Sequence, residues 1–150
     1  ATASQCMLAG AAILHAGGFA VKVESSGAVH SAASWLAQAA RCETHVGALY
    51  IGFVALNSRQ QQVYSCGMHL FGLPDAITQL TTSPLSAGEL LRGFLMSMLH
   101  EQPSLFSEVS TLDDGAGHRY LLTLEVCTFF EPDDPYYNPH GLWRLNPITA

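Results

Sequence analysis

The sequence predicts an α+β fold in which helices cover mainly one face of a sheet. After a first helical segment, strand and helix patterns follow the order β-α-β-β-α-β, as in the ferredoxin-like, split βαβ arrangement. The composition is 49% hydrophobic and only 12% charged, against roughly 25% charged residues in an average globular protein. A chain of 150 residues fits one domain. We therefore expect a single domain over 1–150, with an extra N-terminal helix, an extra strand and an irregular C-terminal tail.

The first two elements are a helix and a short strand, separated by a pair of glycines. Apolar residues recur at helical spacing over residues 3–15, and Gly17–Gly18 would end that helix. Over residues 19–24 a large apolar residue stands at every second position, beginning with Phe19. This alternation predicts a strand with one buried face.

A Ser-Ser-Gly turn after this strand is expected to open the second helix. The turn occupies Ser25–Gly27, and the helix is predicted from about Val29 to Arg41. Backbone N–H groups are free at the start of a helix and carry partial positive charge. The turn is therefore a candidate binding site for an anionic group.

The middle of the chain predicts a β-hairpin. Gly47–Leu56 is a nearly unbroken apolar run, and its length favours a strand buried on both faces. Asn57–Gln61 is polar and predicts a turn. Gln62–Phe71 then alternates as the returning strand.

A third helix is predicted after a break at Gly72–Asp75. Ser86 and Glu89 have the spacing of a capping box, so Ser86 is the expected N-cap. The helix would end near Glu101, because Pro103 prevents its continuation.

The last third of the chain predicts two strands and a tail. Leu105–Leu112 is a candidate strand, and a turn follows at Asp113–Gly117. His118–Phe130 is the last long strand. Pro132–Pro147 is rich in proline and aromatic residues without a period, so we expect it to lie across the body as an irregular tail.

The charge pattern argues against some classes of partner. The formal net charge is −6 and Lys22 is the single lysine, whereas proteins that bind a nucleic-acid backbone need clustered Lys and Arg. No apolar run reaches the roughly 18 residues of a membrane span. So few charges favour an apolar surface kept for a partner, most simply a second copy of the chain, and we expect a homo-oligomer.

The cysteines and the first residues bear on the compartment. The four cysteines are far apart, and a domain with an apolar core does not need the two disulfides that they permit. Reduced, buried thiols in a cytoplasmic protein are therefore expected. The chain starts without Met and without the basic region of a signal peptide, while a helical pattern is already under way. We expect that further residues precede it in the native protein.

Motifs for metal binding or nucleophilic catalysis are missing. The seven histidines include no His-x-x-x-His pair, and no Cys-x-x-Cys occurs, so neither a metal nor a cofactor is expected unless distant residues assemble a site. Gly-x-Ser-x-Gly is also absent. Ser25 or Ser26 could act as a nucleophile with His30 as base, but serine at a helix start is more often an N-cap. No catalytic residue is identified, and an enzyme is not favoured.

One group of polar residues around the first strand is a candidate ligand site. Strand and turn would present a lysine, an acid and backbone donors, and an acid on the last strand could join them in a ferredoxin-like sheet. The alternative is a solvated face with ordinary cross-strand pairs. The candidate residues are Lys22, Glu24, Ser25, Ser26, Gly27, His30 and Glu125.

Two stretches carry a family resemblance. One is Lys22–Gly27 followed by His30-Ser31 and Trp35, and the other is Gly67–Asp75. Together they resemble a bacterial domain family of unknown function, in which a strand ends in a Gly-x-x-x-x-Gly-x-Pro-acidic turn. Asp75 stands where Glu is expected. The resemblance implies bacterial origin and an α+β fold, and it supplies no catalytic residue.

Two functions follow as hypotheses. A non-catalytic binding or interaction domain that associates with itself is favoured by the low charge and by the lack of catalytic spacing. The alternative is a small-molecule enzyme or sensor that holds a carboxylate or phosphate ligand at the strand-turn-helix 22–30.

Overall fold

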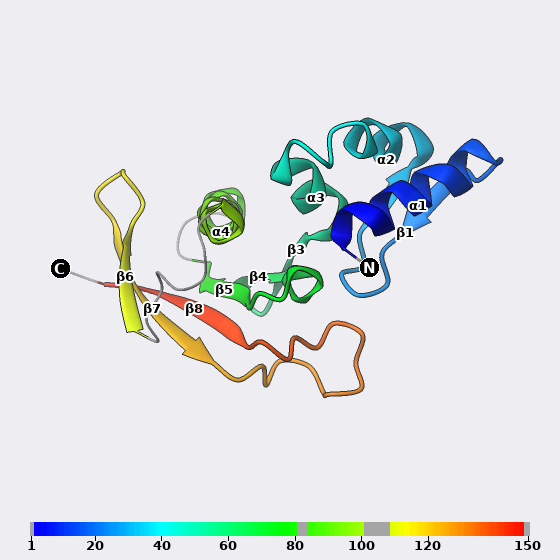
Figure 1. Cartoon of the computed structure of the whole chain (residues 1–150). Coiled ribbons are helices and arrows are strands. Elements are labelled where there is room, and N and C mark those ends of the chain that lie inside the picture. The colour runs from blue at the N-terminus through cyan, green and yellow to red at the C-terminus, as the bar shows by residue number, and fades with distance from the viewer. Residues whose placement is uncertain (1, 81–83, 101–108, 149–150) are drawn as a thin grey trace.

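The computed structural model describes residues 2–80, 84–100 and 109–148, which form an α+β fold (Figure 1). The helices are α1 (Ala3–His15), α2 (Ala32–Ala39), α3 (Val46–Phe53), the 3-10 helix η1 (Met68–Phe71) and α4 (Pro84–His100). The strands are β1 (Ala20–Lys22), β2 (Val29–Ser31), β3 (Ala55–Arg59), β4 (Gln62–Cys66), β5 (Asp75–Gln79), β6 (Val109–Asp113), β7 (Arg119–Glu125) and β8 (Leu142–Pro147).

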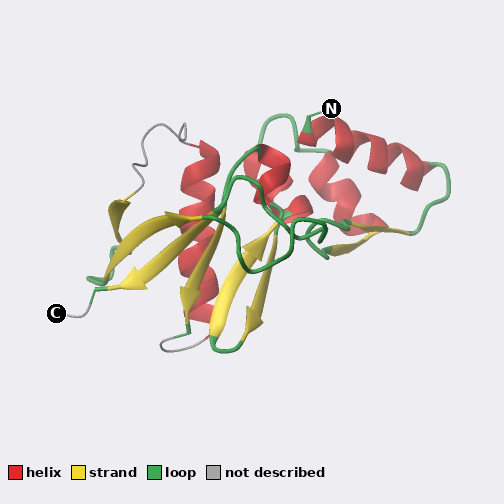
Figure 2. Cartoon of the chain, turned by 90° about the horizontal axis from the view of Figure 1, so that it is seen from below, coloured by secondary structure: helices red, strands yellow, loops and turns green. Residues whose placement is uncertain are grey.

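A mixed sheet of six strands forms the larger half of the molecule (Figure 2). Its order is β3-β4-β5-β8-β7-β6, so β3 and β6 are its edge strands. Neighbouring strands are antiparallel except for β5 and β8, which run parallel with Asp75 opposite Leu142. Helix α4 lies against one face and contacts β4 and β5.

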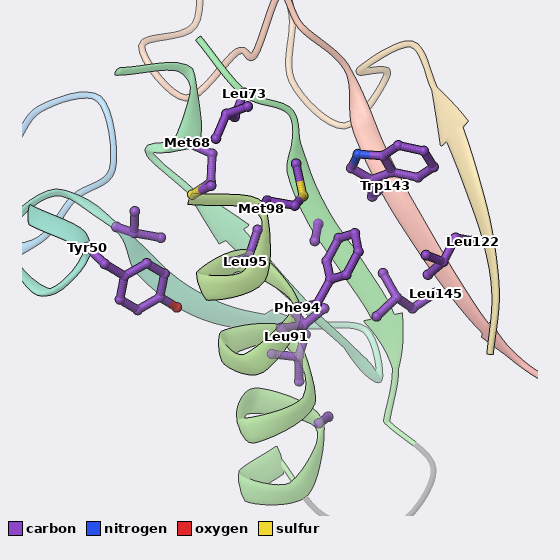
Figure 3. Close-up of a cluster of buried hydrophobic side chains, with 14 residues drawn as sticks. Tyr50, Met68, Leu73, Leu91, Phe94, Leu95, Met98, Leu122, Trp143 and Leu145 are labelled. Carbon is purple, nitrogen blue, oxygen red and sulfur yellow. The ribbon is translucent and has the colours of Figure 1, made fainter. Parts of the chain in front are cut away.

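The larger hydrophobic cluster fills the space between α4 and this sheet (Figure 3). Leu91, Phe94 and Leu95 project from α4 at helical spacing and are buried. They meet Trp143 and Leu145 of β8, and the rings of Phe94 and Trp143 pack edge to face at 6.2 Å. The helix is thus held by the apolar stripe that its sequence predicts.

A second cluster joins α1, α2 and α3 to the β1–β2 hairpin. Trp35 is its centre: the indole Nε1–H donates to Met7 O at 3.0 Å, and the ring packs edge on against Phe53 at 5.5 Å. The bounds of α1 confirm the first predicted helix, and Thr2 and Gln5 form a capping box at its start.

The second helix begins later than expected, because the residues before it form a strand. β2 pairs with β1 and places Val21 opposite His30, so Ser25–Gly27 is the turn of a hairpin and not a helix start. Helix α2 begins after Ser31, whose side chain accepts a hydrogen bond from Ser34 N at 3.2 Å. Three alternating residues are too few for periodicity to distinguish a strand from a first helical turn.

The prediction of a strand over Gly47–Leu56 is wrong, since most of this run is helix α3. α3 is apolar on nearly every side because α1, α2 and α4 all contact it. A continuous apolar run does not distinguish a buried helix from a buried strand. The hairpin that follows is confirmed with shifted bounds: β3 pairs with β4 through a turn at Gln60 and Gln61, which have φ of 49° and 61°.

The centre of the sheet is formed by β5 and β8. β5 falls in the loop between Gly72 and Ser86, where the sequence leaves a short extension of strand open, and β8 falls in the tail expected to be irregular. β8 pairs with both β5 and β7, so the C-terminal segment is a central strand. The ferredoxin-like order is not confirmed, because β1 belongs to a separate two-stranded sheet.

The remaining elements agree with their predictions except at their ends. α4 begins at Pro84, so Ser86 lies within the first turn and is not the N-cap. β7 confirms the last long strand with narrower bounds. β6 confirms the strand before it but extends to Asp113, while 101–108 lie outside the described residues. In the described part of the chain, no helix combines the length and apolarity needed to cross a bilayer.

Candidate functional site

The residues predicted to bind a ligand are divided between the two sheets. Lys22 Nζ, at the end of β1, forms an exposed ion pair with Glu24 Oε2 at 2.9 Å. Glu125 lies on β7, where both of its oxygens accept hydrogen bonds from Arg144 Nε, at 2.9 and 3.0 Å. Each acid has its own basic partner, and the expected juxtaposition of first and last strands is not formed because β1 lies outside the larger sheet.

Two backbone donors of the Ser25–Gly27 turn are used inside the hairpin. Ser26 N and Gly27 N both donate to Val23 O, at 3.3 and 2.8 Å. Ser26 is buried, and its Oγ accepts from Ala28 N at 3.3 Å. No helix starts at this turn, so the electrostatic argument for a bound carboxylate or phosphate does not apply here.

His30 and Gly27 connect this hairpin to its neighbours. His30 Nε2 lies 3.0 Å from the carbonyl oxygen of Gly52 in α3, rather than beside Ser25 or Ser26. A Cβ on Gly27 would lie 3.0 Å from the Tyr136 hydroxyl, so the loop before β8 packs closely against the turn. Both residues serve packing between elements.

The Gly67–Asp75 stretch forms a closed turn around η1. Gly67 has φ +118° and Gly72 has φ +73°, conformations that favour glycine. A Cβ on Gly67 would overlap Phe53 O. The Asp75 carboxylate accepts from Met68 N at 3.3 Å and so closes the turn from the far end.

Asp75 is the centre of a buried polar network. Its Oδ1 accepts from Ser65 Oγ at 2.7 Å, and its Oδ2 accepts from Asn138 Nδ2 at 2.7 Å. Asn138 Nδ2 also donates to Leu73 O at 2.9 Å. Burial raises the pKa of Asp75 to about 6, although hydrogen bonds from Asn138 and Ser65 oppose the rise.

A small hollow of about 10 Å³ lies beside this network. Its polar lining includes Asp75, Ser65 and Asn138. The rest of the lining is mainly aromatic and apolar: Tyr64, Phe129, Phe130, Tyr136, Cys127 and Leu142. The hollow therefore combines a buried carboxyl group with aromatic rings.

A much wider cleft, of about 1160 Å³, lies between α4 and strands β6, β7 and β8. Ligand pockets commonly measure roughly 300–1,000 Å³, so the cleft has room for a small molecule or a peptide segment. Its large apolar lining residues come from both sides: Leu90, Phe94, Leu112, Tyr120 and Ile148.

Small residues on α4 keep this cleft open. Ser86, Gly93 and Ser97 line it, at spacings that put them on one side of the helix. An added Cβ on Gly93 would meet no atom within 4 Å. The Ser97 hydroxyl turns back to donate to Gly93 O at 3.0 Å. The width of the cleft is therefore encoded in the sequence of α4.

The charged lining of the cleft is mainly acidic. Glu89, Asp113 and Asp114 supply three carboxylates, and Arg119 supplies one guanidinium group. His118 lies beside Asp114, with Nδ1 at 2.8 Å from Asp114 Oδ2. With three carboxylates and one guanidinium group, and without counting His118, the lining has a net charge of −2.

The β6–β7 turn holds Asp114 in its ionised form. Asp114 Oδ1 accepts from Ala116 N at 2.8 Å and from His118 N at 3.0 Å. Desolvation acts to raise the pKa of Asp114, but the hydrogen bonds from His118 and Ala116 outweigh it and lower the pKa. Negative charge is therefore fixed at this end of the cleft.

Compared with protein-family models, curated proteins and solved structures, the chain has no match. Among the residues that the structure describes, no group of three or more His, Cys, Asp or Glu is placed to hold a metal ion. The features of the structure that bear on function are therefore the small hollow beside Asp75 and the wider cleft beside α4.

Sequence reasoning does not find this cleft because it does not find β8. The cleft depends on β8 linking the β6–β7 hairpin to the strands under α4. Two signals were available: Trp143 and Leu145 alternate with polar residues, and Gly93 and Ser97 interrupt the apolar pattern of α4. The Asp113–Gly117 turn is predicted from the sequence, but its spacing does not link its carboxylates to a site.

Proposed function

We propose that the chain is a non-catalytic binding domain whose cleft between α4 and strands β6–β8 receives a basic, partly apolar peptide segment of a partner protein. The observation that carries this proposal is a cleft of about 1160 Å³ with a largely apolar lining and mainly acidic charge. Burial of apolar side chains drives association, and complementary charge selects the partner. The net charge of −6 acts in the same direction.

An extended segment would have a further point of attachment at β6. This strand is an edge of the sheet as described, and Leu112 and Asp113 at its end line the cleft. An edge strand can pair with an added strand through its backbone, while alternate side chains of that strand enter neighbouring pockets. This geometry favours a peptide over a compact ligand.

The hydrogen bonds of the lining hydroxyl groups support binding without catalysis. Thr78 Oγ1 donates to Leu145 O at 3.0 Å, and Ser97 Oγ donates to a carbonyl of its own helix. Asp114 orients His118 as a carboxylate orients a general base. The backbone N–H of His118 also donates to Asp114 Oδ1 at 3.0 Å, so this pair stabilises the β6–β7 turn.

The binding test uses two capped, fluorescein-labelled peptides, Lys-Leu-Lys-Leu-Lys and Glu-Leu-Glu-Leu-Glu. Fluorescence anisotropy at low salt should show the basic peptide binding about tenfold more tightly or better, with the difference shrinking as salt is added. Equal affinities, tighter binding of the acidic peptide, or no binding of either would refute the proposal.

Three variants of α4 locate the binding. Gly93→Leu should abolish it, because the new side chain would occupy the cleft without meeting a neighbour. Gly93→Ala and Gly88→Ala are the controls, and Gly88 faces Leu56 outside the cleft. Replacing Gly within a helix adds roughly 0.5–1 kcal/mol of stability, so lost binding would not reflect unfolding. Binding that survives Gly93→Leu would place the peptide elsewhere.

A second candidate function is self-association through the smaller half of the molecule, which we propose from its exposed apolar side chains. Ile13, Phe19 and Val29 are 67%, 89% and 68% exposed. Sedimentation velocity over a range of micromolar concentrations should show a homo-oligomer that Phe19→Ser combined with Val29→Ser dissociates. Leu85→Ser, an equally exposed site on α4, is the control. A monomer at every concentration would contradict this candidate.

A cytoplasmic, bacterial origin is also proposed. Bacterial origin is proposed from the resemblance of Lys22–Gly27 and Gly67–Asp75 to a bacterial domain family of unknown function. Cytoplasmic location is supported by four free thiols, three of them buried. Thiol titration of protein purified without reductant and then denatured should give four thiols per chain. Loss of a pair of thiols would argue against this compartment.

A further inference from the structure

Asp75 is a buried acid without a basic partner. Its side chain accepts hydrogen bonds from Ser65 Oγ, Met68 N and Asn138 Nδ2, all of which are neutral donors. In the described part of the chain, no Lys, Arg or His forms an ion pair with it. Burial raises the pKa of Asp75 to about 6, which leaves it largely ionised at neutral pH. Buried charges are normally paired, so this carboxylate lacks a cation.

The hollow beside Asp75 has room for one small group. Its volume of about 10 Å³ corresponds to a single water-sized occupant. Asp75, Ser65 and Asn138 all line it, so an occupant would lie next to the hydrogen-bond network of the carboxylate.

Four aromatic side chains line the same hollow and contact one another in series. The ring centroids of Tyr64 and Phe129 are 4.8 Å apart, those of Phe129 and Phe130 are 5.3 Å apart, and those of Phe130 and Tyr136 are 5.5 Å apart. Aromatic faces carry negative potential and attract cations. A ring face at the wall of the hollow would therefore favour a positive occupant over a neutral one.

We propose that this hollow binds the head of a primary alkylammonium group, with the ammonium beside the Asp75 carboxylate and the alkyl stem leaving the hollow past the aromatic rings. An ammonium head is about the size of a water molecule and donates three hydrogen bonds, which suits both the volume and the carboxylate. A quaternary ammonium has the same charge but is too large for the hollow. A free alkylamine and a lysine side chain of a partner offer the same chemistry.

The test titrates n-butylammonium chloride and Nα-acetyl-lysine methylamide into isotope-labelled protein at neutral pH, followed by two-dimensional NMR. We expect saturable shifts of the Asn138 side-chain amide and of the Met68 backbone amide, because both donate directly to Asp75. Binding of the lysine derivative alone would identify a protein lysine as the source, and binding of butylammonium alone would identify a free amine.

Control ligands separate charge from size. n-Butanol has the same stem without the charge, and tetramethylammonium chloride has the charge without the fit. Neither should shift these amides at matched concentration and ionic strength. Equal shifts with either control, or no shift with either amine because water alone occupies the hollow, would overturn the proposal.

Variants complete the test. Asp75→Asn should abolish the amine-dependent shifts, and Phe129→Leu should reduce the apparent affinity severalfold by removing one ring face. Glu24→Gln makes the same acid-to-amide change at an exposed position in the turn after β1 and should have no effect. If Asp75→Asn does not fold, Phe129→Leu decides, and unchanged affinity in that variant would overturn the proposal.

Discussion

The carboxylate of Asp75 joins β4 through Ser65, η1 through Met68 and the loop before β8 through Asn138. Burying the ionised carboxylate is unfavourable, and burial raises the pKa of Asp75 from 3.8 to about 6. At pH values between 3.8 and about 6, Asp75 is therefore protonated to a greater extent in the native protein than in the unfolded chain. The Asp75 contribution to the free energy of unfolding is therefore fully present below about pH 4 and is lost as the pH rises through about 6.

We expect this contribution to fall by about 3 kcal/mol between about pH 4 and pH 7, from a pKa difference of about two units. Urea unfolding of the wild type and of Asp75→Asn across this range isolates it, because other titrating groups are shared and cancel in the comparison. The stability of the variant relative to the wild type should rise with pH. A difference that does not change with pH would contradict the assignment.

The buried hydroxyl of Tyr50 lowers the free energy of unfolding for a different reason. It is buried without a hydrogen-bond partner among the described residues, and burial raises its pKa to about 12. Figure 3 shows the hydroxyl directed toward α4 within the larger cluster. An unpaired buried hydroxyl is destabilising, so Tyr50→Phe should increase the free energy of unfolding by about 1 kcal/mol. A loss of stability in denaturant unfolding would show that the hydroxyl has a partner.

At the scale of elements, η1 is bounded by two glycines whose surroundings differ. Gly67 has φ +118° and lies against Phe53 O, whereas Gly72 has φ +73° with no atom within 4 Å of an added Cβ. Gly72→Ala should therefore cost about 1–2 kcal/mol, the backbone strain alone.

Gly67→Ala should cost clearly more, about 3 kcal/mol or above, because β4 and α3 must move apart in addition to the strain. Thermal and denaturant unfolding of the two variants gives the comparison directly. Equal costs would mean that the close approach to Phe53 is not retained in solution.

The sequence predicts the elements of this fold better than their pairing. α1 and α4 have amphipathic stripes and are found, and the β6–β7 hairpin is found from its Asp-Asp-Gly turn. The identity of α3 is missed because an apolar run on every side fits two structures. β8 is missed because it is a six-residue segment ending in Pro147 that is stabilised as a strand by β5 and β7, and both are distant in sequence.

The hollow beside Asp75 and the cleft beside α4 could not be predicted from the sequence for the same reason. Asp75, Asn138 and Phe129 are brought together only by folding of the loop before β8, so no local spacing reveals them. The cleft likewise needs α4 and β8 in place. The predicted site around Lys22 depended on a helix start and on a shared sheet, and neither is formed.

At the scale of the whole molecule, two hydrophobic clusters meet at Phe71, which packs against both. The Phe53 ring of α3 lies 6.3 Å from the Phe71 ring, edge to face. Each cluster contains one of the two tryptophans, Trp35 in the smaller and Trp143 in the larger. Fluorescence can therefore follow each half separately.

We expect one cooperative transition, because separating the halves would expose Phe71 and the α3 surface to water. In Trp143→Phe the remaining Trp35 should report the same urea midpoint as far-ultraviolet circular dichroism, and Trp143 should do so in Trp35→Phe. Phe71→Ala in each background removes the shared ring and should move the two midpoints apart. Distinct midpoints before that substitution would show that the chain is two domains, contrary to the prediction of one over 1–150.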